Sequence, residues 1–132
     1  MKGILVVDDD PRIVDIIEKF LVIEGFEVNK AFDAATALEM IDRGGMPELI
    51  ILDARMPGMS GEEFVLEIRK TPKRIPVIVL TGSVNIPPSG KGGVYENLLY
   101  KPVKLADLLK EVQRLLGVKT PDTSGGTEKK YQ

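Results

Sequence analysis

Three consecutive aspartates, Asp8, Asp9 and Asp10, directly follow an aliphatic run in the stretch ILVVDDDPR, which covers residues 4–12. Carboxylates this close repel one another, which raises their pKa values unless a cation lies nearby. Pro11 and the helical spacing after it favour Asp10 as the cap of a helix. Asp8 and Asp9, which in isolation could be solvated turn residues, are therefore the candidate ligands of a cation.

Each of three further reactive side chains also follows an apolar run: Asp53, Thr81 and Lys101. The chain contains no Cys and no His. Their absence from the sequence excludes thiolate nucleophiles, disulfides, zinc sites built from thiolate or imidazole, serine–histidine triads and phosphohistidine carriers. Any chemistry must therefore use carboxylates, hydroxyls and amines.

Short aliphatic runs alternate with segments of helical period along the chain. The runs predict five strands, over residues 4–7, 26–31, 49–52, 77–80 and 98–100. Helices are predicted from the Asp10 cap to Gly25, over residues 34–43 (capped by Asp33), over residues 61–71, and from Leu105 to Leu116 with Gly117 at the end. Because short connections between parallel strands favour right-handed crossovers, we expect a doubly wound α/β fold with both faces of the sheet covered.

The apolar stripes of two helices define part of the expected core. The first helix carries its stripe on Ile13, Ile16, Ile17, Phe20 and Leu21, and the third on Phe64, Val65 and Ile68. We expect these side chains to face the sheet.

The ligand site of such a sheet lies outside the carboxyl ends of its strands. Asp8, Asp9, Asp53, Thr81 and Lys101 are expected to converge there. Three neighbouring carboxylates stay ionised only beside a cation, and oxygen ligands with room for water suit Mg2+. One carboxylate could then attack a phosphoryl group, because aspartyl phosphate is an established intermediate, with the ammonium and the hydroxyl stabilising the phosphoryl oxygens.

The same residues carry a resemblance to a known family. LVVDD, LIILDARMPGMSG over residues 49–61, VIVLTG over residues 77–82 and YKP over residues 100–102 follow one another in an order that resembles receiver domains of two-component response regulators. The resemblance covers about residues 3–116. It implies a flavodoxin-like, CheY-like sheet with the strand order 2-1-3-4-5.

The resemblance also implies a role for each acidic residue. Asp53 would be the phosphoacceptor and would also contact Mg2+. Asp9 would bind Mg2+ directly and Asp8 largely through water, and the backbone carbonyl of Arg55 would complete the protein ligands.

The remaining site residues would act on the phosphoryl group. Thr81 and Lys101 would contact its oxygens, with the Lys101–Pro102 bond in the cis form. Because the chain has no His, the donor would be a histidine kinase or phosphotransfer domain acting in trans. The cationic Arg55 side chain, two residues after the acceptor, is hypothesised to pair with the phosphoryl group and slow its hydrolysis.

The segment before Lys101 departs from the family pattern. Residues 82–96 contain four glycines and two prolines, which cost a helix interior roughly 1 and 3 kcal/mol each. We therefore expect the fourth helix of the family to be short or missing. The aromatic switch residue that the family places three positions before the lysine is replaced by Leu98, and Tyr100, on the same side of the strand, is a candidate substitute.

Length and composition limit the setting of the protein. A chain of 132 residues fits one domain, assigned to residues 1–116, with a polar linker or tail at residues 117–132. Its 18 basic and 20 acidic residues provide no basic face for nucleic acid. No apolar run reaches the roughly 20 residues of a membrane span, and the start lacks the pattern of a signal peptide, so we expect a soluble, cytoplasmic domain without membrane contact.

Three functions stay open at this point. The first is a phosphoaccepting switch for an unidentified output domain or protein, which catalyses only its own phosphorylation and dephosphorylation. The second is a receiver-like interaction module that does not switch, as the degraded fourth helix suggests. The third is a phosphohydrolase of the haloacid-dehalogenase type, because Asp8-Asp9-Asp10 satisfies an Asp-x-Asp spacing, although Pro11-Arg12 is a poor continuation and no segment forms a cap over a substrate.

Overall fold

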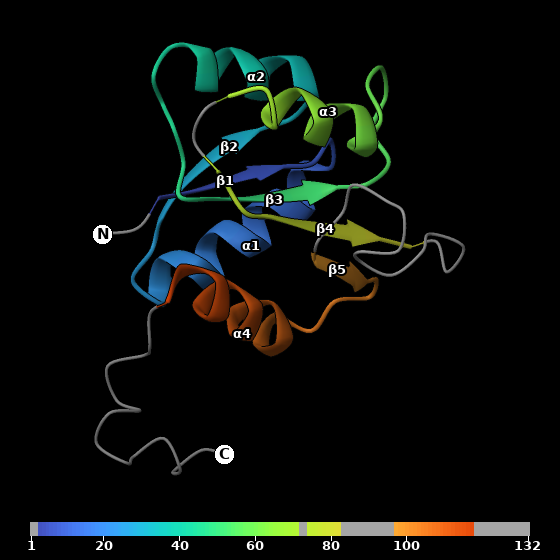
Figure 1. Ribbon diagram of the computed structural model, residues 1–132. Coiled ribbons are helices and arrows are strands. Elements are labelled where there is room, and N and C mark those ends of the chain that lie inside the picture. The colour runs from blue at the N-terminus through green and yellow to red at the C-terminus, as the bar shows by residue number, and fades with distance from the viewer. Residues whose placement is uncertain (1–2, 72–73, 83–96, 118–132) are drawn as a thin grey trace, which may run out of the picture.

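The computed structural model describes residues 3–71, 74–82 and 97–117 (Figure 1). Strands and helices alternate over these residues as β1 (Gly3–Val7), α1 (Pro11–Ile23), β2 (Glu27–Ala31), α2 (Ala34–Asp42), β3 (Leu49–Asp53), α3 (Gly61–Ile68), β4 (Val77–Thr81), β5 (Asn97–Tyr100) and α4 (Leu105–Leu116). The five predicted strands are confirmed, and each end lies within one residue of its predicted position.

The strands form one parallel sheet in the order β2-β1-β3-β4-β5. Helices α2 and α3 cover one face of the sheet, and α1 and α4 cover the other (Figure 1). The predicted doubly wound α/β fold and its strand order are therefore confirmed. The short or missing fourth helix was predicted within residues 82–96, of which 83–96 lie outside the described residues, as does the tail from residue 118 onward.

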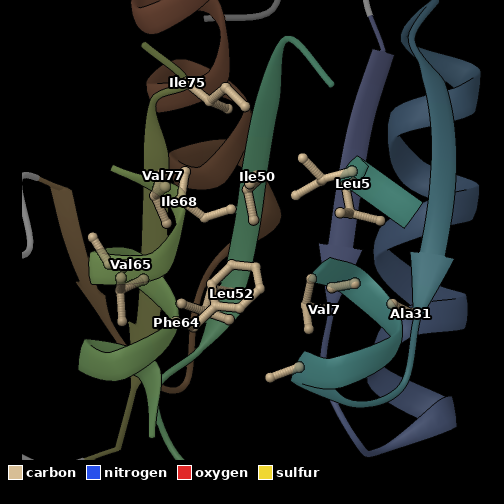
Figure 2. Packing of buried hydrophobic residues seen from close by; sticks show 14 of the residues in the cluster. Leu5, Val7, Ala31, Ile50, Leu52, Phe64, Val65, Ile68, Ile75 and Val77 are labelled. Carbon is tan, nitrogen blue, oxygen red and sulfur yellow. The ribbon is translucent and has the colours of Figure 1, made fainter. Parts of the chain in front are cut away.

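The core has two parts, one on each face of the sheet. Every residue of β3 and β4 is buried, because a parallel sheet with helices on both faces leaves neither side to solvent. Under α3, the side chains of Phe64, Val65 and Ile68 pack toward Leu52 and Val77 of the sheet (Figure 2). The inward face predicted for this helix is confirmed.

The core face of α1 differs from the predicted stripe. Val14, Ile17 and Leu21 are the buried residues of this helix, whereas Ile16 is 53% exposed. The prediction was therefore wrong for Ile16 and omitted Val14. An apolar stripe fixes the width of a helix face but not its centre, and here the sheet contacts the i, i+3, i+7 row that runs through Val14.

The predicted caps of α1 and α2 are confirmed. The Asp10 carboxylate accepts a hydrogen bond from the Arg12 backbone N–H, and the Asp33 carboxylate accepts one from the Thr36 N–H at 2.7 Å. At its end, α4 is closed by Gly117, whose φ of 68° lies in the left-handed region that favours glycine.

Helix α3 is shorter than predicted, because it ends at Ile68 and not at residue 71. The Thr71 N–H and hydroxyl both donate to the Ile68 carbonyl, at 3.1 and 2.8 Å. A proline follows Thr71 in the sequence and disfavours the helical conformation of the residue before it. The local side-chain bond and the proline together therefore stop the helix early.

The helices of the described residues do not combine the length and the hydropathy that a membrane span requires.

Candidate functional site

The carboxyl ends of β1, β3, β4 and β5 place the reactive residues along one edge of the sheet. The Asp8 N–H donates to the Ala31 carbonyl at 3.2 Å, which continues the β1–β2 ladder one residue past β1. Asp53 is the last residue of β3, and Thr81 is the last residue of β4. The Lys101 N–H donates to the Thr81 carbonyl at 2.7 Å. Backbone pairing within the sheet therefore positions the Cα atoms of these four residues.

The structure brings the three candidate acids together. Carboxylate oxygens of Asp8, Asp9 and Asp53 all lie within 4.8 Å of one another. Asp8 and Asp53 are only 2% and 5% exposed, whereas Asp9 is exposed. Asp10 does not belong to this group, because its side chain caps α1.

Lys101 forms an ion pair with Asp53. The Lys101 Nζ atom lies 3.0 Å from Asp53 Oδ1, and the Arg55 N–H donates to the same oxygen at 3.4 Å. The Lys101–Pro102 bond is cis, as the family resemblance implied. The candidate acceptor thus contacts a cation and also lies close to two further carboxylates.

Thr81 and Tyr100 are neighbours across the last rung of the sheet. Thr81 is buried at the edge of the site, whereas Tyr100 is exposed. Leu98, which occupies the position of the usual switch aromatic, packs against the core beneath α2 and α3. The assignment of Tyr100 as a switch residue stays a prediction.

Asp8 is the most strongly perturbed group of the site. Its burial, with a smaller contribution from the charges of Asp53 and Asp9, raises its pKa to about 6, although the Asp10 N–H and Lys101 act in the opposite direction. Its Oδ1 atom accepts a hydrogen bond from the Asp10 N–H at 2.9 Å. Its Oδ2 atom is buried and, within the described part of the chain, has no hydrogen-bond partner.

These observations test whether the residues fit a metal ion. A buried carboxylate oxygen without a partner is costly, and a coordinated cation would remove that cost. Carboxylate ligands of mixed burial, with open space on the Asp9 side, suit a hard cation that retains water, which is the behaviour of Mg2+. The residues present therefore fit Mg2+.

The fold and the site define a small doubly wound α/β domain with a cluster of three carboxylates and a lysine at the carboxyl edge of its sheet. Residues 4–113 match the family model of the response regulator receiver domain. The chain belongs to this family, so the family predicted from the sequence motifs is confirmed.

Curated relatives are response regulators. The response regulator MprA of Mycolicibacterium vanbaalenii is 34% identical over 125 residues, which are 93% of this chain and 54% of the relative. MprA of Mycobacterium leprae is 35% identical over 121 residues, or 90% of this chain and 53% of the relative. The chain thus spans about half the length of these relatives.

Similar solved structures are receiver domains as well. The response regulator TrrA of Thermotoga maritima, solved in complex with Mg2+ and BeF, has 35% identity and a TM-score of 0.78, and the match covers 88% of this chain and all of TrrA. The receiver domain of the Francisella response regulator 1452 has 27% identity and a TM-score of 0.80, with coverage of 89% and 98%. A complex of the histidine kinase ThkA with TrrA also matches, with 35% identity, a TM-score of 0.77 and coverage of 88% and 99%.

Proposed function

We propose that this chain accepts a phosphoryl group on Asp53 from a histidine kinase or phosphotransfer domain, with Mg2+ as cofactor, and thereby switches an output domain or protein. The observation that carries this proposal is the surroundings of Asp53. Its buried carboxylate is paired with Lys101 at 3.0 Å and lies within 4.8 Å of two more acidic side chains. A helix cap or a solvated turn needs no such arrangement, whereas phosphoryl transfer does.

In this proposal Asp9 and Asp53 bind the metal ion directly through carboxylate oxygens, Asp8 binds it largely through water, and the backbone carbonyl of Arg55 supplies a further ligand. The Oδ2 atom of Asp8, which is buried and has no hydrogen-bond partner among the described residues, supports this assignment. When bound, Mg2+ neutralises the carboxylates and stabilises negative charge on the phosphoryl oxygens. The complex of TrrA with Mg2+ and BeF supports the same cofactor for this chain.

The chemical step is a displacement at phosphorus. A carboxylate oxygen of Asp53 forms a bond to the phosphorus atom of the donor's phosphohistidine while the P–N bond breaks, and the imidazole nitrogen keeps the bonding electron pair. The Lys101 ammonium group moves from Asp53 to one oxygen of the transferred phosphoryl group. The Thr81 hydroxyl donates a hydrogen bond to a second oxygen of that group. Hydrolysis reverses the state of the site, because water attacks phosphorus, inorganic phosphate leaves and the Asp53 carboxylate is restored.

The donor protein needs a surface next to Asp53. A groove of about 390 Å3 lies between α1 and the β5–α4 connection, and its lining includes Ile13, Ile16, Lys101 and Pro102. Since Lys101 both lines this groove and contacts Asp53, a donor bound there has its phosphohistidine close to the acceptor. The complex of ThkA with TrrA supports a histidine kinase as the donor.

The donor surface can be tested separately from the chemistry. With a histidine kinase that phosphorylates this chain, Ile16→Glu is expected to slow transfer from the kinase, because the half-exposed Ile16 lines the groove. Labelling by the small donor acetyl phosphate should not change. Equal kinase rates for the wild-type protein and the variant would remove the groove from the proposal.

The proposed reaction is tested by exposing the full chain to acetyl phosphate, or to beryllofluoride as a mimic, with and without Mg2+. We expect Mg2+-dependent incorporation of one phosphoryl group in the wild-type protein and none in Asp53→Asn. Labelling of Asp53→Asn at the wild-type level would refute Asp53 as the acceptor.

NMR spectra of the same samples separate a switch from a non-switching interaction module, which stays the second candidate. Chemical-shift changes that start at Thr81 and Lys101 and extend through residues 83–100 would support the switch. Changes confined to the pocket would favour the module. The family match argues against the haloacid-dehalogenase alternative, so we expect no turnover of a generic phosphate ester.

A cytoplasmic location and the absence of direct contact with nucleic acid or membrane stay predictions from the sequence. The division into a receiver domain at residues 1–116 and a linker or tail at residues 117–132 is likewise part of the proposal.

A further inference from the structure

The orientation of the Asp8 carboxylate depends on a single backbone donor. The Asp10 N–H lies 2.9 Å from Asp8 Oδ1, and no other hydrogen bond to this carboxylate occurs among the described residues. Because Oδ1 accepts this hydrogen bond, Oδ2 is the oxygen of Asp8 that has no hydrogen-bond partner among the described residues. Asp8 is one of the three acids of the cluster. The direction of the Asp10 N–H therefore decides which oxygen of Asp8 is available to a cation.

The Asp10 side chain restrains the backbone of Asp10 through hydrogen bonds with Arg12. Its Oδ1 atom accepts a hydrogen bond from the Arg12 N–H at 2.9 Å, which caps α1. The Arg12 guanidinium donates to both carboxylate oxygens of Asp10, from Nε at 3.3 Å and from Nη2 at 3.2 Å. Pro11 adds a restriction on the backbone of the residue before it, which keeps Asp10 extended at φ −97° and ψ 107°.

These contacts also keep Asp10 away from the cation. Its carboxylate is engaged by the first turn of α1 and by Arg12, and the acidic group that could hold a metal ion consists of Asp8, Asp9 and Asp53. The third aspartate of the run is therefore near the site without being one of its ligands.

We propose that Asp10 is a positioning residue for the Mg2+ site: its side-chain cap on α1 fixes the backbone N–H that orients the Asp8 carboxylate. This inference rests on the proposed Mg2+ site and adds a residue to it. Hydrogen bonds that orient metal ligands commonly affect metal affinity by about 10–100-fold. We expect the lower end of this range, because Pro11 continues to restrict the backbone when the cap is removed.

The test compares two variants of the full chain that remove the same charge. Asp10→Ser keeps an N-cap acceptor, whereas Asp10→Ala has none. The Mg2+ dissociation constant of each is measured by NMR titration at one pH and ionic strength. We expect Asp10→Ala to bind Mg2+ about tenfold more weakly than Asp10→Ser, and we expect the amide of residue 10 to exchange faster with solvent in Asp10→Ala without metal.

A third variant controls for the general effect of losing a helix cap. Asp33→Ala removes the cap of α2, which lies on the opposite face of the sheet from α1. It should leave the Mg2+ dissociation constant within about twofold of the wild-type value, as expected for a site that does not touch the ligands. If Asp10→Ala does not fold, Asp10→Gly replaces it, because glycine is a tolerated cap residue without a side-chain acceptor.

The Mg2+ titrations distinguish a failure of the role of Asp10 from a failure of the proposed function. Equal Mg2+ affinity of the capping and non-capping variants at position 10 would overturn the role of Asp10 and leave the proposed function standing. A wild-type protein without affinity for Mg2+ would overturn the proposed cofactor itself.

Discussion

Removing the charge of Asp8 should stabilise the metal-free protein. The pKa of this buried carboxyl group is raised from 3.8 to about 6, chiefly by burial. A folded-state pKa above the unfolded value means that the folded state binds the proton more tightly. The stability associated with protonated Asp8 is therefore complete below about pH 4 and is lost as the pH rises through about 6.

The size of the effect follows from the pKa difference. A shift of roughly two pKa units at about 1.4 kcal/mol each corresponds to about 3 kcal/mol, as an upper value. Asp8→Asn removes this cost, because the amide stays neutral, and its oxygen can still accept the hydrogen bond from the Asp10 N–H. We therefore expect Asp8→Asn to be more stable than the wild-type protein at pH 7.5 by up to about 3 kcal/mol when Mg2+ is removed.

Urea denaturation in EDTA at pH 4, 5, 6 and 7.5 measures this difference in the free energy of unfolding. The wild-type protein should lose stability relative to Asp8→Asn over this range, and the difference should level off above pH 6. Saturating Mg2+ should then reduce the stability advantage of Asp8→Asn or reverse its sign. The reason is that a ligand at 100 times its dissociation constant adds about 2.7 kcal/mol to the stability of the form that binds it. Parallel pH profiles of the two proteins in EDTA would refute the reasoning.

Three other substitutions test the ion pair, the core and the hydrolysis step. Lys101→Met leaves the buried Asp53 carboxylate without its cation, so we expect unfolding in EDTA to become easier by about 1–3 kcal/mol in urea titrations; no loss of stability would mean that the pair contributes nothing. Phe64→Ala empties the fully buried space between α3 and the sheet and should cost about 3–5 kcal/mol in the same assay, and a cost below 1 kcal/mol would contradict the packing in Figure 2. Arg55→Ala should shorten the lifetime of phosphorylated Asp53 in a radiolabel chase, because it removes the cation proposed to pair with the phosphoryl group, and an unchanged lifetime would rule out that role.

Much of the fold follows from local sequence patterns. Residues 49–53 and 77–81 are continuous apolar runs that end in a polar residue, which predicts buried strands of a parallel sheet and their functional edge. Asp10 and Asp33 precede helical periods and cap them, as predicted. The patterns that predict these features involve residues only a few positions apart, so they can be recognised in the sequence without the tertiary structure.

The sequence was less informative about which residues of an apolar helix face are buried and about where a helix ends. Ile16 and Val14 are both compatible with an apolar stripe on α1, and the position of the sheet decides that Val14 is buried and Ile16 exposed. Similarly, the helical period of α3 continues to residue 71, but the Thr71 hydroxyl, which donates to the Ile68 carbonyl, and the proline that follows Thr71 end the helix three residues earlier.

Periodicity, capping residues and the ordered motifs were sufficient to predict the strands, most helix bounds, the family and the types of side chain at the edge of the sheet. Two features of the site are visible only in the folded molecule: Lys101 pairs with Asp53 across 48 positions of the chain, and one oxygen of Asp8 is buried without a hydrogen-bond partner among the described residues. The tertiary structure also raised the pKa of Asp8. Burial and the distances between charges depend on how separate strands align, and no short stretch of sequence specifies that alignment.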